Sequence, residues 1–220
     1  MAKPRETKDR IFEQFARIGQ AMASPKRLEL LDLLCQAEKT VEMLAAQASL
    51  NVANASRHLQ ILRAARLVDA RRDGTHVYYR LADDDVCSFF HGLRKLASAR
   101  LAEMDFIVEE YFDRPQRLKP IDRRKLIKKA RAGEIIILDV RPKEEFLAGH
   151  LPLAHSIPFS ELKDRLDQLP ADAEVVAYCR GPYCVLAQEA VRIMRAKGRK
   201  AVRLEDGVME WREAGMAVEK

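Results

Sequence analysis

The chain has 220 residues, of which 48% are hydrophobic and 33% charged, and its formal net charge is +6. This length suits two domains of about 100–110 residues each, and the composition excludes a disordered or membrane-embedded protein. No apolar run approaches the ~18–20 residues that a membrane-spanning helix needs, and the charged N-terminus differs from a signal peptide. We therefore expect a cytoplasmic protein without a membrane partner, whose four cysteines remain thiols.

Hydrophobic periodicity predicts four helices at the start of the chain. Apolar residues recur at helical spacing over residues 7–22. Ser24-Pro25 supplies an N-cap and a proline at the first position of a second helix. Thr40 is a candidate cap for a short third helix, and residues 52–65 are expected to form the fourth.

A β-hairpin and a long helix follow. Strand patterns at residues 67–72 and 75–81 flank Asp73-Gly74. This dipeptide is a strong hairpin signal because type I′ turns need a positive φ at both central residues. The long helix is expected over residues 83–111.

The excess of positive charge lies between the two halves of the chain. Residues 113–131 carry 9 Lys/Arg against 2 Asp/Glu, and the rest of the chain is nearly balanced. The net charge is therefore a weak argument for nucleic acid binding. Arg114-Pro115 ends the preceding helix, because the residue before proline avoids the α region. Together with Pro120 it marks an interdomain linker, residues 114–120.

The order helix, turn, helix and Arg-flanked hairpin is typical of a winged helix-turn-helix, whose second helix fits the major groove of DNA. In the helix over residues 52–65, Ala55, Leu59 and Leu62 share one face and are expected to pack inward. The opposite face and the hairpin tip carry hydrogen-bonding groups and cations suited to bases and phosphates. The candidate DNA contacts are Asn54, Ser56, Arg57, His58, Gln60, Arg63, Arg71, Arg72, Thr75 and His76.

Several short motifs occur together in this half: Ser24-Pro25-Lys26-Arg27-Leu28, Ser56-Arg57-His58-Leu59-Gln60-Ile61-Leu62, Leu67-Val68, and Arg72-Asp73-Gly74 followed by Tyr78-Tyr79-Arg80-Leu81. With them, residues 8–110 resemble the ArsR family of winged-helix repressors. The resemblance implies a homodimer, formed by the first and last helices, that reads a palindromic operator in double-stranded DNA. The alternative is a winged-helix module that serves protein contacts and presents its arginines to solvent.

The first half lacks the ligand patterns of known sensors in the resembled family. Members bind metal through paired thiols on the third helix or Asp/His pairs on the last, but the third helix here has no cysteine and His91 has no second histidine at ligand spacing. No metal site is predicted. A second subgroup senses persulfide through two cysteines, whose positions hold Asp32 and Ser98 here. Cys35 and Cys87 lie near these positions but are displaced, and we expect core or structural roles for them.

The second half alternates short apolar strands with helices. Strand patterns at residues 135–140, 175–178 and 202–204 alternate with helical patterns at 162–169 and 185–197. This alternation predicts a small parallel α/β sheet covered by helices.

One loop in this half has the features of a site with a cysteine nucleophile. Its sequence is Tyr178-Cys179-Arg180-Gly181-Pro182-Tyr183-Cys184-Val185. Between a strand and a helix, a thiolate is stabilised by the helix N-terminus and by amides pointing at it. Such amides can also hold an anionic persulfide or a small oxyanion. Cys179 is the predicted nucleophile, and the six residues after it form the predicted persulfide or anion loop.

Further motifs surround this loop: Asp139-Val140-Arg141-Pro142, Glu144-Glu145-Phe146, Gly149-His150-Leu151-Pro152, Ala154-His155, Ile157-Pro158, and Leu204-Glu205-Asp206-Gly207 with Trp211 and Gly215. With them, residues 121–218 resemble a single-domain rhodanese. The resemblance implies that Cys179 accepts a sulfane sulfur from a small donor and passes it to a thiol acceptor. It makes Asp139, Arg141 and Glu145 mainly scaffold residues.

Two residues depart from the patterns of related cysteine-loop proteins. Cys184 stands late in the loop, where many rhodaneses have Arg, Lys, Ser or Thr, and it is either a resolving thiol or a small packing residue. Leu186 stands where Cys-phosphatases and arsenate reductases carry a closing arginine, which favours sulfur chemistry over phosphate or arsenate.

We expect two domains joined by a linker. Residues 1–113 form a mainly α winged helix-turn-helix domain, residues 114–120 are the linker, and residues 121–220 form an α/β rhodanese domain with a parallel sheet. We predict a transcriptional repressor without a cofactor, in which the sulfur or redox state of Cys179 alters DNA affinity. Two alternatives stay open. One is a thiosulfate or persulfide sulfurtransferase with an autoregulatory DNA-binding domain, and the other is a metal- or metalloid-responsive repressor with a non-catalytic rhodanese module.

Overall fold

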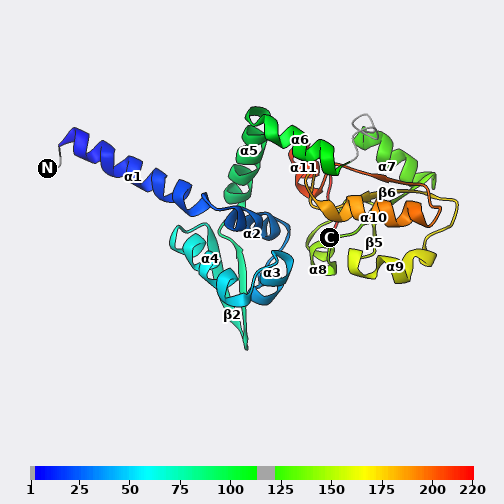
Figure 1. The fold of residues 1–220 in the computed structure, drawn as a ribbon, viewed down its shortest axis with the longest axis horizontal. Helices are drawn as coiled ribbons and strands as arrows, with labels where there is room; N and C mark the ends of the chain where they lie inside the picture. The colour runs from blue at the N-terminus through cyan, green and yellow to red at the C-terminus, as the bar shows by residue number, and fades with distance from the viewer. Residues whose placement is uncertain (1–2, 113–121) are drawn as a thin grey trace. The chain divides into compact units, whose positions relative to one another are not determined.

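The computed structural model describes residues 3–112 and 122–220. The chain divides after Leu101 into two compact units (Figure 1). The predicted linker, residues 114–120, lies outside the described residues.

The first unit begins with four helices and a small sheet. The helices are α1 (Pro4–Met22), α2 (Pro25–Gln36), α3 (Val41–Gln47) and α4 (Val52–Ala64), and the strands are β1 (Lys39–Thr40), β2 (Val68–Asp73) and β3 (His76–Leu81). Side-chain caps begin two of the helices: Thr40 accepts from the Met43 amide at α3 and Asn51 from the Asn54 amide at α4. The strands are antiparallel in the order β1-β3-β2, so the winged helix predicted from the sequence is confirmed.

The hairpin turn lies one residue later than the sequence predicts. Asp73 pairs with His76, so the two loop residues are Gly74 and Thr75 rather than Asp73 and Gly74. Gly74 has a φ of 58°, and a glycine with positive φ at the first loop position is what type II′ hairpins favour.

The core of the first unit confirms the predicted inner face of α4. Ala55, Leu59 and Leu62 are fully buried among leucines of α2 and α3. Burying a leucine side chain contributes about 1.5–3 kcal/mol, so this face holds α4 in place and turns its polar face outward.

The predicted long helix is two helices, α5 (Asp84–Arg100) and α6 (Ala102–Tyr111). Leu101 between them has an extended backbone, with φ −104° and ψ 103°. The apolar spacing continues across this break without a glycine or proline, which is why the sequence predicts one helix. α6 belongs to the second unit, where the Tyr111 hydroxyl donates to Glu189 at 2.7 Å.

The second unit has a four-stranded parallel sheet in the order β5-β4-β6-β7, which confirms the predicted α/β class. Its strands are β4 (Ile135–Asp139), β5 (His155–Ser156), β6 (Glu174–Tyr178) and β7 (Ala201–Arg203). Its helices are α6, α7 (Arg123–Arg131), α8 (Lys143–Ala148), α9 (Leu162–Arg165), α10 (Val185–Ala196) and α11 (Val208–Glu213), with 3-10 turns η2 (Phe159–Glu161) and η3 (Leu166–Gln168).

Successive residues of the central strands point to opposite faces of this sheet and pack in two separate hydrophobic cores. Leu138 and Val175 pack in one cluster, whereas Ile137 and Val176 pack in the other. Among the described residues, no helix combines the length and apolar character needed to cross a membrane.

Candidate functional site in each unit

The outer face of α4 is the candidate DNA reader of the first unit. Asn54, Arg57, Gln60 and Arg63 are exposed, and Ser56 and His58 are half-buried. The buried inner face fixes this orientation, so all six predicted residues of α4 are at least partly open to solvent.

The wing carries the other candidate contacts, and Arg71 is held by an ion pair with Glu38. Arg72, Thr75 and His76 are exposed. Arg71 instead donates to both carboxylate oxygens of Glu38, at 2.7 and 3.0 Å, and stacks over the Tyr78 ring at 4.4 Å. The hydrogen bonds that Arg71 donates to Glu38 raise the pKa of Arg71 above its usual value. Arg71 therefore supports the base of the wing in this structure.

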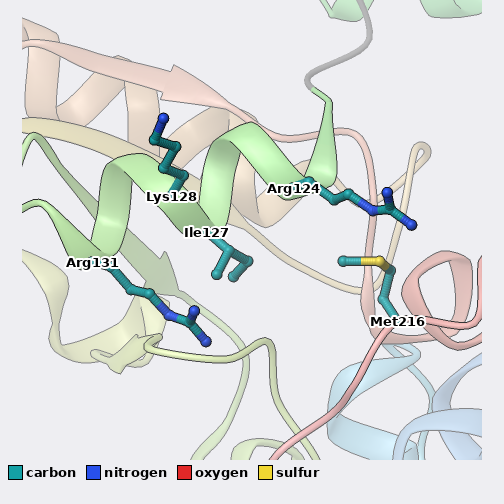
Figure 2. A pocket seen from close by; sticks show the side chains of 5 residues that line it. All are labelled: Arg124, Ile127, Lys128, Arg131 and Met216. Atoms are coloured by element: carbon teal, nitrogen blue, oxygen red, sulfur yellow. The ribbon is translucent and has the colours of Figure 1, made fainter.

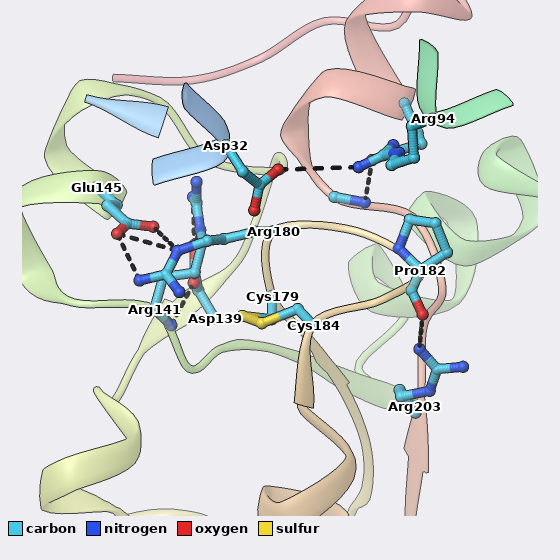
Figure 3. The surroundings of a disulfide bond; sticks show 12 residues. Asp32, Arg94, Asp139, Arg141, Glu145, Cys179, Arg180, Pro182, Cys184 and Arg203 are labelled. Carbon is cyan, nitrogen blue, oxygen red and sulfur yellow. Dashed lines mark hydrogen bonds and ion pairs between the residues drawn. A yellow bond between two sulfur atoms is a disulfide. The ribbon is translucent and has the colours of Figure 1, made fainter. Parts of the chain in front are cut away.

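The predicted nucleophile lies immediately after β6, at the carboxyl edge of the parallel sheet. Cys179 is 1% exposed, and it forms a disulfide with Cys184, with Cα atoms 6.1 Å apart (Figure 3). The expectation that the cysteines are free thiols is wrong for this structure. The loop turns back between residues 179 and 184, because Gly181 adopts a φ of 139° and its carbonyl accepts from the Cys184 amide.

Cys184, rather than Cys179, is the N-cap residue of α10. The positive end of a helix dipole acts within its first turn. In the dithiol state the 12-residue α10 therefore stabilises a thiolate on Cys184 most directly. The sequence predicts the helix-stabilised thiolate at Cys179, whereas the residue at the start of α10 is Cys184.

Neighbouring side chains brace the loop. Arg180 donates from Nε and Nη2 to the fully buried Glu145 carboxylate, at 2.8–3.2 Å (Figure 3). Arg203 donates to the Pro182 carbonyl at 3.0 Å. Because Glu145 neutralises Arg180, the loop receives less positive charge from this arginine than its sequence position suggests.

A buried network underlies β4 and β6. Arg141 pairs with Asp139 at 2.7 Å and donates to the Gly149 carbonyl at 2.8 Å. Burial alone would lower the pKa of Arg141, but the Asp139 carboxylate raises it above its usual range. Burial raises the pKa of Tyr178 well above its ordinary value, and Asp139, which accepts from its hydroxyl, adds to the shift. These residues hold the strand ends, as the predicted scaffold role requires.

Position 207, which packs against the cysteine loop, requires a glycine. A Cβ on Gly207 would lie 2.5 Å from the Arg180 carbonyl carbon and 2.8 Å from the Gly181 nitrogen. The start of α11 and the cysteine loop therefore approach each other backbone to backbone. The predicted motif that includes Gly207 thus contacts the loop directly.

A hollow of about 290 Å³ lies along α7, lined by Arg124, Ile127, Lys128, Arg131 and Met216 (Figure 2). Its cations come from the basic stretch that the sequence places between the two halves. The part of this stretch over Arg123–Arg131 is a helix of the second unit.

A second cysteine pair lies in the first unit, where the sequence predicted only core or structural roles. Cys35 of α2 and Cys87 of α5 form a disulfide with Cα atoms 5.6 Å apart. His91 is 1% exposed, and its nearest ring nitrogen and both sulfurs lie within 4.8 Å of one another. The available signal was the i, i+4 spacing of Cys87 and His91, which places both on one helix face.

The fold and these sites define a class of protein: a winged-helix DNA-binding unit joined to a rhodanese-like α/β unit. Residues 24–70 match the family described as bacterial regulatory protein, arsR family, and residues 122–214 match the rhodanese-like domain. The chain belongs to the ArsR family of bacterial transcriptional regulators and carries a C-terminal rhodanese-like domain.

One curated relative is similar to this chain along its whole length, and others are similar to its first half. The chain is 44% identical over 220 residues to the HTH-type transcriptional regulator Rv0324 of Mycobacterium tuberculosis, covering 100% of this chain and 96% of that protein. It is 41% identical over 78 residues to the transcriptional repressor SmtB homolog of Synechocystis sp., which covers 36% of this chain and 59% of that protein. The homodimeric winged helix-turn-helix domain of Mb0332 from Mycobacterium bovis is 42% identical, with a TM-score of 0.43, covering 46% of this chain and 94% of that one.

Proposed function

We propose that this ArsR-type regulator is a repressor that binds a palindromic operator as a homodimer, and that its DNA affinity depends on the sulfur state of Cys179.

DNA contact is supported by the outer face of α4 and by the wing. Arg57 and Arg63 extend from a helix whose inner face is fixed in the core, and Arg72 is exposed near the wing tip. Arginines suit both the guanine edge and phosphate oxygens. In this proposal α4 reads bases while the wing contacts the DNA backbone.

Dimerisation is supported by apolar side chains that solvent reaches on α1 and α5. Phe12 and Phe15 of α1 are 58% and 63% exposed, and Phe89 and Leu96 of α5 are 57% exposed. Several large exposed apolar side chains on two helices of one unit are typical of a contact surface rather than a solvated one. A second copy of the chain is the partner that the family resemblance implies.

The sulfur step uses the two loop cysteines. The Cys179 thiolate attacks the sulfane sulfur of thiosulfate, which forms a persulfide on Cys179 and releases sulfite. The Cys184 thiol then attacks the Cys179 sulfur, which forms the Cys179–Cys184 disulfide and releases hydrosulfide. The observation that carries this proposal is that the two cysteines are close enough to bond.

The test is operator binding at fixed salt by the reduced full chain, measured before and after addition of thiosulfate. We expect an affinity change in the wild type that is absent in Cys179→Ser. In Cys184→Ser we expect the persulfide to accumulate, visible as a mass increase of one sulfur atom. Tight DNA binding that ignores the donor in all three proteins would contradict the coupling.

Sulfite release, measured on the same samples, distinguishes the proposed regulator from the alternative in which the chain is mainly an enzyme. Continuous turnover of thiosulfate with a thiol acceptor, together with unchanged DNA affinity, would make the chain a sulfurtransferase with a DNA-binding domain.

A further inference from the structure

The Cys35–Cys87 pair joins α2, which packs in the same core as α4, to α5, which carries the exposed Phe89 and Leu96. Cys35 lies near the end of α2, half-buried against the core, and Cys87 lies in the first turn of α5 with 3% exposure. An ion pair between Asp32 and Arg94, at 3.9 Å, links the same two helices. The cysteines therefore sit at a junction that packing and charge already hold together.

His91 completes a set of three soft and borderline ligands. It follows Cys87 by one helical turn, and its nearest ring nitrogen and the two sulfurs lie within 4.8 Å of one another. Zinc–sulfur bonds of about 2.3 Å and zinc–nitrogen bonds of about 2.0 Å at tetrahedral angles separate such ligand atoms by roughly 3.5–3.8 Å. Small side-chain rotations would bring the three reduced side chains to that spacing.

The charge balance suits a divalent cation. Two thiolates carry two negative charges and a neutral imidazole carries none, so the complex with a divalent ion has no net charge. A neutral complex avoids the large cost of burying an uncompensated ion, which matters because Cys87 and His91 are almost fully buried. Both thiols release their protons on binding.

We propose that Cys35, Cys87 and His91 form a binding site for a thiophilic divalent cation of the zinc and cadmium class when the cysteines are reduced. A low-molecular-weight thiol reduces the disulfide and is itself oxidised to a disulfide. The cation then takes the two sulfurs and one ring nitrogen, and its fourth position stays open to water or an exogenous ligand. Metal binding and disulfide formation at this pair are mutually exclusive. This inference does not depend on the sulfur chemistry of Cys179.

The test uses the reduced full chain with Cys179→Ser and Cys184→Ser, so that only Cys35 and Cys87 remain as thiols. Cadmium is titrated without oxygen or free thiol, and the thiolate-to-cadmium charge-transfer absorption is recorded. We expect saturation at one cadmium per chain. Loss of Cys87 by Cys87→Ser should remove the absorption. His91→Gln should weaken binding by more than the roughly 10–100-fold that loss of an outer-shell partner causes.

The matched control is His155→Gln, which changes an exposed histidine and should leave the titration unchanged. A second readout needs no variant at the site: bound cadmium should protect Cys35 and Cys87 from alkylation, measured for each cysteine by mass spectrometry. Circular dichroism shows whether Cys87→Ser is folded. Unprotected cysteines, or absorption that survives both Cys87→Ser and His91→Gln, would overturn the proposal.

Discussion

Glu145 of α8 binds Arg180, the residue that follows Cys179 in the loop. Its carboxylate is fully buried, and it accepts the hydrogen bonds of Arg180, whose side chain is 12% exposed. A buried carboxylate of this kind is tolerated because its partner compensates the desolvation. The loop residue after the nucleophile is thereby tied to α8.

Replacing Glu145 by glutamine should destabilise the second unit by about 3–5 kcal/mol, because the Arg180 charge would remain largely buried without its counter-charge. Urea unfolding followed by fluorescence of the single tryptophan measures this, since Trp211 is fully buried in the second unit. Glu134→Gln, at an exposed position, is the control and should have little effect. An unfolding midpoint equal to that of the control would show that Glu145 and Arg180 are not a structural pair.

At the scale of elements, α4 and the wing should contribute to DNA binding in different ways. Arg57→Ala should weaken operator binding by about 1–3 kcal/mol. It should also relax the sequence preference of the protein, because contacts to base edges determine which sequence is bound. Arg72→Ala should weaken binding to all sequences by a similar factor. It should also reduce the slope of log affinity against log salt concentration by about 1, because one phosphate contact is lost.

Binding isotherms on operator and unrelated duplexes, each at several salt concentrations, separate these two effects. Arg131→Ala, on α7, serves as the control cation outside the first unit. The assignment of α4 as the reading helix is wrong if Arg57→Ala lowers affinity for both duplexes by the same factor.

The contact between α6 and α10 should depend on pH. The Tyr111 hydroxyl donates to Glu189, and this bond, followed by that from Arg192, lowers the pKa of Glu189 below its ordinary 4.5. A carboxyl whose folded pKa is lowered stabilises the fold above its unfolded pKa, and the contribution is lost as the pH falls through the lowered value.

We therefore expect Glu189→Gln to lower the urea midpoint of the second unit slightly at pH 7. The difference from wild type should vanish well below pH 4.5, where the wild-type carboxyl is protonated too. The effect is small because the Glu189 side chain is 36% exposed and solvent screens it. A difference that persists unchanged in acid would mean that the charge of Glu189 contributes nothing.

At the scale of the whole molecule, the exposed aromatic residues of α1 should control oligomeric state. Phe15→Glu should leave the isolated fold intact, since Phe15 is 63% exposed, but it should weaken a dimer by about 2 kcal/mol or more if the ring is an interface anchor. Sedimentation at several concentrations measures the dimer, and Leu147→Glu, 59% exposed on α8, is the control. A wild-type chain that stays monomeric at all concentrations contradicts the dimer.

Local patterns predicted most of the elements and their inner faces. Ala55, Leu59 and Leu62 follow helical spacing, and the alternation of strands and helices after residue 121 determines a parallel sheet. The break at Leu101 could not be predicted, because no proline or glycine marks it and α6 packs in the second unit through Tyr111. The turn at Gly74 was misplaced by one residue, since strand pairing rather than the dipeptide sets the register.

The sequence by itself determined the winged helix, the rhodanese-like sheet and the position of Cys179 between a strand and a helix, because these depend on local periodicity and on short motifs. Only the tertiary structure decided which groups meet across long separations. Cys35 and Cys87 are 52 residues apart, and Glu145 and Arg180 are 35 apart. Such contacts depend on how packed helices and strands are placed by the hydrophobic core, and no local pattern carries that information.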